Sequence, residues 1–245
     1  MSLLEFALFG AGRIGRVHAK NIAASGLARL RWVVDPDREA AQALAESFGA
    51  QATTEPQRAL ADRDVGAVIV ASPTPTHVDL VIGAAREKKA IFCEKPIDLD
   101  LDRIDDALEA VEKADVPFFV GFNRRFDPSF ARLKEQLATG RIGRLELLSI
   151  TSRDPEPPSA EYLARSGGLF ADMMIHDFDM ARWLLGEEPV PIADATGGTP
   201  LHVACIKNDQ QMLCRGARSL GKCEINIPTH RPVNMTSSFM HCSLL

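Results

Sequence analysis

The amino-acid sequence predicts an α/β fold, with a doubly wound parallel β-sheet in the first half of the chain. Short apolar runs alternate there with amphipathic stretches, a pattern that indicates repeated βαβ units. A glycine-rich turn follows the first apolar run and opens the first amphipathic stretch. Since crossovers between parallel strands are right-handed, these units are expected to build one sheet with helices packed against it.

The apolar pattern sets the limits of the expected elements. Buried strands are predicted at residues 4–9, 30–34, 67–71, 90–93 and 117–122. Helices are predicted between them, at residues 13–24, 38–48, 75–88 and 101–114. Pro75 suits the first turn of its helix, and Asp100 is expected to cap the next helix.

The alternation becomes irregular after residue 120. We expect a helix at residues 127–139, a strand at 145–151, a proline-rich loop at 154–159 and a helix at 167–185. The sequence therefore predicts a first domain over residues 1–120, followed by an incomplete α+β domain over residues 121–193.

Composition restricts the class of protein. The 245 residues are 46% hydrophobic and 25% charged, which is ordinary for a globular protein and argues against disorder. A formal net charge of −5 argues against nucleic acid as a partner, because phosphate binding needs a basic surface. No apolar run approaches the roughly 18 residues of a membrane span. We expect a cytoplasmic protein with no membrane partner.

The glycine-rich turn has the spacing G-x-G-x-x-G, with glycines at positions 10, 12 and 15. Between a strand and a helix, this spacing is typical of a Rossmann dinucleotide-binding domain, where the helix N-terminus faces the pyrophosphate. Asp35 ends the second predicted strand, twenty residues after Gly15. A carboxylate there binds ribose hydroxyls and repels a 2′-phosphate, so NAD is favoured over NADP. An unrelated glycine turn and a plain strand-end aspartate are the alternatives.

Polar residues end the next two strands of the predicted sheet. Ser72-Pro73-Thr74 follows one strand and Glu94-Lys95-Pro96 follows the other. Ligands of open α/β sheets sit at the carboxyl ends of the strands, so both segments are expected to face the cofactor. A lysine after a strand is commonly a solvated charge, but a partly desolvated Lys95 could donate to a substrate oxygen and stabilise an alkoxide.

Asp172 and His176 lie four residues apart in a predicted helix, so they share one helix face. A surface Asp–His pair is the simplest interpretation. The same pair suits a general base, because a carboxylate orients the imidazole and stabilises its protonated form. A metal site competes with this, although the first 193 residues hold no Cys/His cluster with zinc spacing.

Six motifs appear in the order of one enzyme family. They are Gly-Ala-Gly-Arg-Ile-Gly at 10–15, Ala-Ser-Pro-Thr-Pro-Thr-His at 71–77, Glu-Lys-Pro at 94–96, Gly-Phe-Asn-Arg-Arg-Phe at 121–126, Ser-Arg-Asp-Pro at 152–155 and Gly-Gly-Leu-Phe-Ala-Asp-Met-Met-Ile-His-Asp at 167–177. Over about residues 3–190 the sequence resembles the Gfo/Idh/MocA oxidoreductases, and among them the inositol-oxidising members. The resemblance implies NAD-dependent oxidation of a secondary hydroxyl of a cyclic polyol, such as myo-inositol to its 2-keto product, by a homo-oligomer.

The resemblance also implies roles for single residues. His176 is the implied proton acceptor, Asp172 its partner and a substrate contact, and Lys95 the donor to the reacting oxygen. Asn123 and Arg153 are implied as further substrate contacts. The implied cofactor contacts are Gly10, Gly12, Arg13, Ile14, Gly15, Asp35, Ser72, Pro73, Thr74, His77, Glu94 and Lys95. No metal is implied.

Residues 194–245 are expected to form an unrelated, irregular tail, because their sequence no longer follows the family pattern. Residues 199–204 match the ankyrin hexapeptide T-P-L-H-x-A, which one repeat cannot stabilise alone. Cys205, Cys214 and Cys223, with His202 nearby, raise a metal site, although their spacing is unusual for zinc. The favoured interpretation is replacement of the family's C-terminal sheet by truncation, frame change or fusion.

A missing sheet would leave the activity and the oligomeric state of the chain open. We expect NAD binding, poor or no turnover, and association through apolar surface, because the strand at 145–151 would lack most of its neighbours. The alternative function is an inactive NAD-binding remnant or adaptor that uses the ankyrin-like segment.

Overall fold

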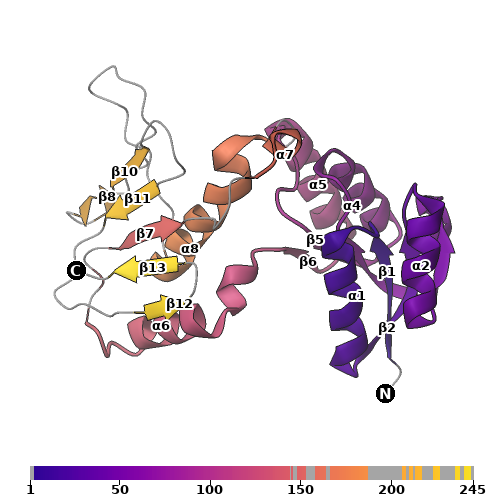
Figure 1. Cartoon of the computed structure of the whole chain (residues 1–245), viewed down its shortest axis with the longest axis horizontal. Coiled ribbons are helices and arrows are strands. Elements are labelled where there is room, and N and C mark those ends of the chain that lie inside the picture. The colour runs from indigo at the N-terminus through magenta and orange to yellow at the C-terminus, as the bar shows by residue number, and fades with distance from the viewer. Residues whose placement is uncertain are drawn as a thin grey trace. The chain divides into compact units, whose positions relative to one another are not determined.

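The computed structural model describes residues 3–143, 145, 148–152, 158–163 and 166–186, together with short strands between residues 206 and 243. The chain divides into two compact units, Met1–Gly121 and Phe122–Leu245. Figure 1 shows a parallel sheet with its helices in the first unit, and helices with short strands in the second.

The first unit is built on a six-stranded parallel sheet with the order β3-β2-β1-β4-β5-β6. Its strands are β1 (Leu4–Phe9), β2 (Ala28–Val34), β3 (Gln51–Thr53), β4 (Val65–Val70), β5 (Ala90–Cys93) and β6 (Phe118–Val120). The chain winds outward from β1 in one direction and from β4 in the other. The strand order therefore reverses between β1 and β4, the position at which doubly wound sheets bind ligands. The predicted α/β fold class is confirmed.

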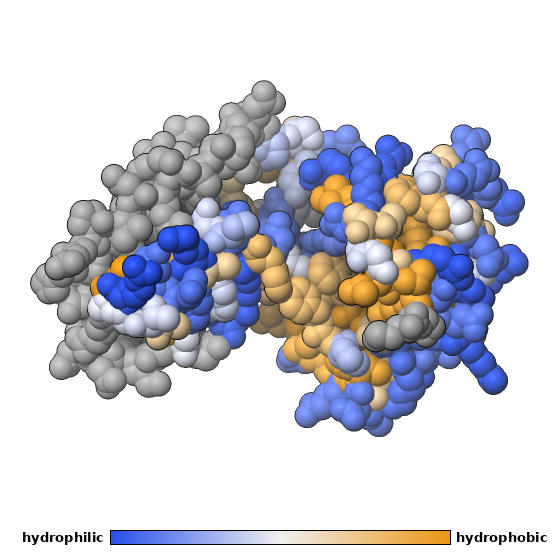
Figure 2. All heavy atoms as spheres, turned by 90° about the horizontal axis from the view of Figure 1, so that it is seen from below, coloured by the Kyte–Doolittle hydropathy of each residue, from blue (hydrophilic) through white to orange (hydrophobic). Residues whose placement is uncertain are grey.

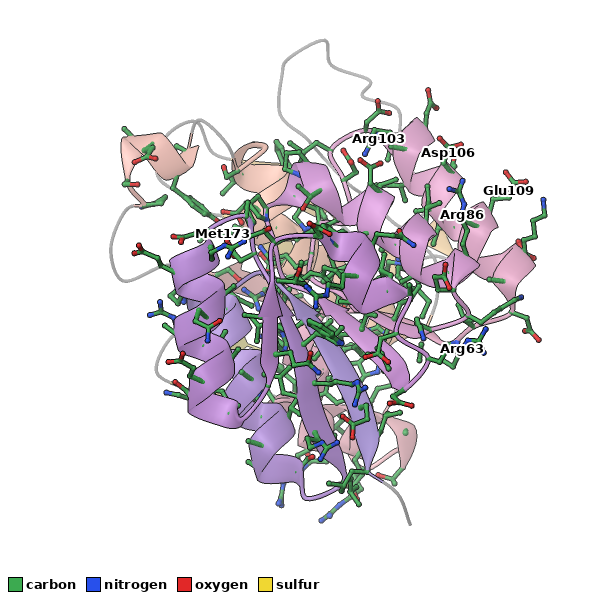
Figure 3. The ribbon with its side chains drawn as sticks, turned by 90° about the vertical axis from the view of Figure 1, so that its right-hand side faces the viewer. Arg63, Arg86, Arg103, Asp106, Glu109 and Met173 are labelled. Carbon is green, nitrogen blue, oxygen red and sulfur yellow. The ribbon has the colours of Figure 1, made fainter. Side chains whose placement is uncertain are left out.

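Helices cover both faces of this sheet (Figure 3). One face packs against α1 (Arg13–Ser25) and α2 (Arg38–Phe48), and the other against α3 (Pro56–Leu60), α4 (His77–Arg86) and α5 (Leu101–Ala114). Successive residues of β1 pack on opposite faces of the sheet: Leu8 lies in the cluster under α1 and α2, and Phe9 lies in the cluster under α3, α4 and α5. Asp106 and Glu109 on α5 point away from the sheet, as Figure 3 shows, so that helix is apolar on one side only.

Apolar side chains also gather on part of the surface of the first unit (Figure 2). Leu3, Leu4 and Leu27 are 45%, 45% and 75% exposed. Leu4 begins β1 and bonds through its backbone N–H to the carbonyl of Leu27, just before β2. These leucines therefore mark the amino edge of the sheet, opposite to the carboxyl edge where ligands bind.

Asp62 provides a test of stability in acid. Its Oδ2 accepts hydrogen bonds from Arg31 Nε at 2.6 Å and Trp32 Nε1 at 2.8 Å, and these bonds lower the pKa of the Asp62 carboxyl to about 2. Because the folded pKa lies below the unfolded value of 3.8, the stabilisation is present above pH 4 and is lost as the pH falls toward 2. We expect a loss on the order of 2 kcal/mol across that window. In denaturant melts from pH 2 to pH 5, Asp62→Asn should remove this pH-dependent part of the free energy of unfolding. The same loss of stability in the variant would show that Asp62 is not its cause.

The second unit begins with the 3₁₀ turn η2 (Asn123–Phe126). Its further elements are α6 (Pro128–Ala138), β7 (Ser149–Ser152), α7 (Ala160–Leu163), the π-helical turn η3 (Phe170–Met174) and α8 (Ile175–Leu185). Leu133 on α6, Ile150 on β7 and Met180 on α8 belong to one buried cluster. That shared core fixes α8 against α6 and β7.

Short strands also occur in the segment that was predicted to be irregular. They are β8 (Ile206–Lys207), β9 (Gln210–Gln211), β10 (Leu213–Gly216), β11 (Cys223–Asn226), β12 (Met235–Ser237) and β13 (Met240–Ser243). Strand β13 pairs antiparallel with both β12 and β7, so β7 has a neighbour that the sequence analysis did not expect (Figure 1). Strands of two to four residues are too short to show an alternating apolar pattern. The ankyrin-like segment at 199–204, with His202 and Cys205, lies outside the described residues.

Candidate active site

The glycine turn after β1 has room for no side chain at two of its three glycines. Gly10 has a φ of +105°, and a Cβ there would lie 2.5 Å from the carbonyl oxygen of Ala71. A Cβ at Gly15 would lie 1.9 Å from the carbonyl oxygen of Gly10. Glycine at both positions is therefore a steric requirement of the turn and of the packing of α1 against it.

Gly12 differs, because a Cβ there would meet nothing within 4 Å. It caps α1 without a side-chain hydrogen bond, and the first helical turn, Arg13-Ile14-Gly15, carries no carboxylate. The backbone N–H groups of that turn are the donors that a helix offers to an anion. The turn thus offers the free backbone donors that a dinucleotide pyrophosphate needs, and a side chain at Gly12 would fill open space beside them.

Asp35 follows β2 and supports the same turn. Its Oδ2 accepts a hydrogen bond from the backbone N–H of Ala11 at 2.7 Å, and its Oδ1 accepts one from the N–H of Asp37 at 2.9 Å. Each carboxylate oxygen has a second lone pair, so the group can still accept from a ribose hydroxyl. Asp35 therefore orders the glycine turn and keeps lone pairs that can accept further hydrogen bonds at the end of β2.

Changing Asp35 to serine should narrow the preference for NAD over NADP. The loss of charge-assisted hydrogen bonds and of repulsion toward a 2′-phosphate amounts to on the order of 1–3 kcal/mol. The measurement is the dissociation constant of each cofactor. Asp37→Ser is the matched control, because Asp37 caps α2 by accepting from the N–H groups of Glu39 and Ala40, and serine is also a good cap. Equal affinity of the unaltered chain for both cofactors would contradict this role.

The loops after β4 and β5 lie side by side, because Val70 of β4 pairs with Cys93 of β5. In the first loop, Thr76 Oγ1 donates to the carbonyl of Pro73 at 2.7 Å and lies 2.6 Å from Ser72 Oγ. The 3₁₀ turn η1 (Thr74–Thr76) continues this loop into α4. These local hydrogen bonds hold the Ser72-Pro73-Thr74 segment in one conformation at the carboxyl edge of the sheet.

The second loop is Glu94-Lys95-Pro96, with a cis peptide bond before the proline. Glu94 Oε1 lies 2.7 Å from Nε2 of His18 on α1, and the ring of His18 packs edge-on against Phe92. The Glu94 side chain therefore ties this loop to the helix that follows the glycine turn. Glu94 was predicted from the sequence as a cofactor contact, whereas its contact with His18 was not predicted, because 76 residues separate the two.

Burial acts on the thiol that precedes this loop. Cys93 is fully buried at the end of β5, and desolvation with the nearby Glu94 charge raises the pKa of its thiol to about 12. A thiol that stays protonated is a poor nucleophile. Cys93 is thus a core residue and not a candidate nucleophile.

Asp172 and His176 lie at the junction of two helical forms in the second unit. Asp172 belongs to the π-helical turn η3, and His176 is the second residue of α8. The hydroxyl of Tyr162 on α7 donates to Asp172 Oδ1 at 2.7 Å, and the His176 ring meets Phe122 edge-on with centroids 6.3 Å apart. Single π turns inside helices are frequent at functional sites, since they re-aim side chains.

Two arginine–aspartate pairs hold α8 to η2. Arg124 Nη1 donates to Asp177 Oδ1 at 2.5 Å, and Ser152 Oγ donates to the same oxygen at 2.5 Å. Arg125 binds Asp179 through two guanidinium nitrogens. Burial raises the pKa of Asp177, while Ser152 and Arg124 oppose that rise. These pairs fix the helix that carries His176, a role that the sequence analysis did not assign to them.

Comparisons with known proteins agree with this geometry. A family model described as "Oxidoreductase family, NAD-binding Rossmann fold" matches residues 4–122, and one described as "GFO/IDH/MocA C-terminal domain" matches residues 130–219. The rhizopine catabolism protein MocA of Rhizobium meliloti is 34% identical over 217 residues, which cover 87% of this chain and 68% of that protein. The chain belongs to the Gfo/Idh/MocA oxidoreductase family. The family resemblance and the NAD cofactor predicted from the sequence are confirmed.

The chain is also similar to two proteins whose names refer to inositol. Inositol 2-dehydrogenase of Rhizobium meliloti is 51% identical over 189 residues, which cover 77% of this chain and 57% of the relative. The crystal structure of scyllo-inositol dehydrogenase from Lactobacillus casei with bound NAD(H) and scyllo-inositol has a TM-score of 0.70 and 29% identity, over 80% of this chain and 62% of that one. The chain spans a little over half the length of such relatives.

The structure distributes the predicted site residues over both units of this family member. The cofactor residues and Lys95 belong to the first unit, whereas Asn123, Asp172 and His176 belong to the second. Arg153 lies outside the described residues. Among the described residues no group of three metal-ligating side chains occurs, and no described helix is long and apolar enough to cross a membrane.

Proposed function

We propose that this chain acts in the NAD-dependent oxidation of a secondary hydroxyl of a cyclic polyol, with myo-inositol as the first candidate and a 2-keto-inositol as product. The proposal rests on Asp172 and His176 at the π-to-α junction, together with a lysine at the carboxyl edge of a dinucleotide-binding sheet. The names of the relatives, inositol 2-dehydrogenase and scyllo-inositol dehydrogenase, support this class of substrate.

The chain's own residues divide the chemistry of alcohol oxidation. His176 accepts the hydroxyl proton, because an imidazole titrates near neutral pH and its charged form is stabilised by a neighbouring carboxylate. Asp172 supplies that carboxylate and contacts the polyol, and its Oδ1 is already held by Tyr162. Lys95 donates to the reacting oxygen and stabilises its developing negative charge. The glycine turn and Asp35 would hold NAD, which would supply the acceptor for the hydride that leaves the carbon.

Asn123 and Arg153 complete the proposed set as substrate contacts. Asn123 opens η2, whose next two residues bind α8, so its backbone position is tied to the helix of His176. We also propose a cytoplasmic location, since the reaction draws on the NAD pool of the cell.

The decisive experiment measures NADH formation by the purified full chain with NAD and a panel of polyols. We expect turnover with myo-inositol or scyllo-inositol, none with an acyclic polyol such as sorbitol, and NAD-dependent thermal stabilisation in parallel. NAD binding without turnover of any inositol would contradict the proposed reaction while leaving the cofactor site intact. Turnover of an acyclic polyol at the same rate would contradict the cyclic substrate class.

A further inference from the structure

His77 is a buried histidine whose two ring nitrogens both face backbone carbonyl oxygens. It begins α4 and is 1% exposed. Its Nε2 lies 2.7 Å from the carbonyl oxygen of Ser72, and its Nδ1 lies 2.9 Å from that of Pro96. Carbonyl oxygens only accept hydrogen bonds, so each contact is a hydrogen bond when the ring nitrogen that faces it carries a proton. A neutral ring donates to one of the two carbonyls, and the imidazolium form donates to both.

These two carbonyls belong to the two loops of the first unit that hold the predicted cofactor contacts and Lys95. Ser72 is in the loop after β4, and Pro96 directly follows Lys95 in the loop after β5. The Glu94 side chain of the same loop is engaged by His18 from α1. The segment around Lys95 is therefore held at one end by His18 and at the other by His77, from two different helices.

We propose that His77 is a positioning residue for Lys95: its bond to the Pro96 carbonyl fixes the Lys95 backbone, while its bond to the Ser72 carbonyl fixes the adjoining cofactor loop. His77 is fully buried and uses its ring on these carbonyls, so it serves the site through the loops rather than by touching NAD. The kinetic part of this inference rests on the proposed role of Lys95, whereas the anchoring of the loops does not.

A second clamp of the same kind lies at the opposite edge of the sheet. The ammonium group of Lys89 is buried and donates to the carbonyls of Asp62 at 2.8 Å and Val65 at 2.7 Å. Val65 begins β4, whereas Ser72 follows its end. Lys89 thus anchors the amino end of β4 through backbone carbonyls, as His77 anchors the loop after its carboxyl end. This makes Lys89 a matched control, at the edge of the sheet away from the ligand.

Two conservative substitutions separate the two bonds of His77. The amide nitrogen of asparagine lies close to the position of Nδ1, so His77→Asn keeps a donor for Pro96 and loses the one for Ser72. The amide nitrogen of glutamine reaches the position of Nε2, so His77→Gln keeps the bond to Ser72 and frees Pro96. Lys89→Gln is the control for a general loss of stability.

The first readout is amide hydrogen exchange of the full chain without substrate, which needs no catalytic activity. Freed loops open more often, so their amides exchange faster. We expect His77→Gln to accelerate exchange at residues 94–98 and His77→Asn to accelerate it at residues 72–76. Lys89→Gln should affect neither segment. Unchanged exchange in both His77 variants, or a uniform increase throughout the first unit, would overturn the proposal.

The second readout is the split between kcat and KM in inositol oxidation. A displaced lysine lowers kcat, and a displacement near 1 Å costs up to about 100-fold, so we expect His77→Gln to lower kcat by about 10- to 100-fold. His77→Asn should keep most of the kcat and weaken NAD binding, and in a Lys95→Ala background the effect of His77→Gln should vanish. An effect of His77→Gln that persists without Lys95 overturns the proposal. If the unaltered chain oxidises no inositol, the proposed function fails and the exchange experiment alone decides this inference.

Discussion

Replacing His176 by alanine is expected to lower inositol oxidation by about 10²–10⁴-fold, the usual contribution of a general base. The variant loses the group that accepts the hydroxyl proton, while the cofactor residues belong to the other unit and keep their contacts. The affinity for NAD should therefore stay unchanged. The measurement is kcat with saturating NAD, across a range of pH.

Two controls separate the loss of a base from a loss of structure. Free imidazole should restore part of the activity of His176→Ala, because it can enter the space that the side chain leaves and accept the proton. Lys95→Ala should lower turnover by about as much through the loss of charge stabilisation, whereas Lys113→Ala, which removes an exposed lysine of α5, should have no effect. Full activity of either His176→Ala or Lys95→Ala would place the catalytic site elsewhere.

The first unit could be predicted closely, because its signals are local. Helices α2 and α5 have the predicted limits, and the Asp100 cap accepts a hydrogen bond from the N–H of Asp102 as expected. The helix predicted at 75–88 is instead η1 followed by α4, since Pro73 and Pro75 favour a tight turn before His77. Strand β3 was missed because Gln51-Ala52-Thr53 is a short edge strand with no apolar run.

The second unit was less predictable, because its contacts join distant parts of the chain. The pairs Arg124–Asp177 and Arg125–Asp179 span more than fifty residues, so no spacing rule finds them. The π turn η3 interrupts the helix predicted at 167–185, although its residues show ordinary helical periodicity. Tyr162 lies ten residues before Asp172 and on a different helical element, so no spacing rule predicts their contact.

The second large effect is expected at the glycine turn, because an added side chain would meet different surroundings at Gly15 and at Gly12. A Cβ at Gly15 would lie 1.9 Å from the carbonyl oxygen of Gly10, a backbone atom that cannot move without displacing the turn. At Gly12 the same atom would meet nothing within 4 Å, and the backbone there, with φ −71° and ψ −167°, is open to any residue. We therefore expect the fold to depend on Gly15 and cofactor binding to depend on Gly12.

Gly15→Ala is accordingly expected to destabilise the first unit by about 1–3 kcal/mol, the cost of overpacking, and to abolish NAD binding. Gly12→Ala should leave the free energy of unfolding nearly unchanged without cofactor and weaken NAD binding by about 10- to 100-fold, through lost hydrogen bonds to the pyrophosphate. Thermal melts with and without NAD distinguish the two: Gly15→Ala melts early in both, whereas Gly12→Ala melts normally and loses only the increase caused by NAD. If NAD still raised the melting temperature of Gly12→Ala, the phosphate would not approach the backbone at this glycine. The cofactor site would then lie elsewhere.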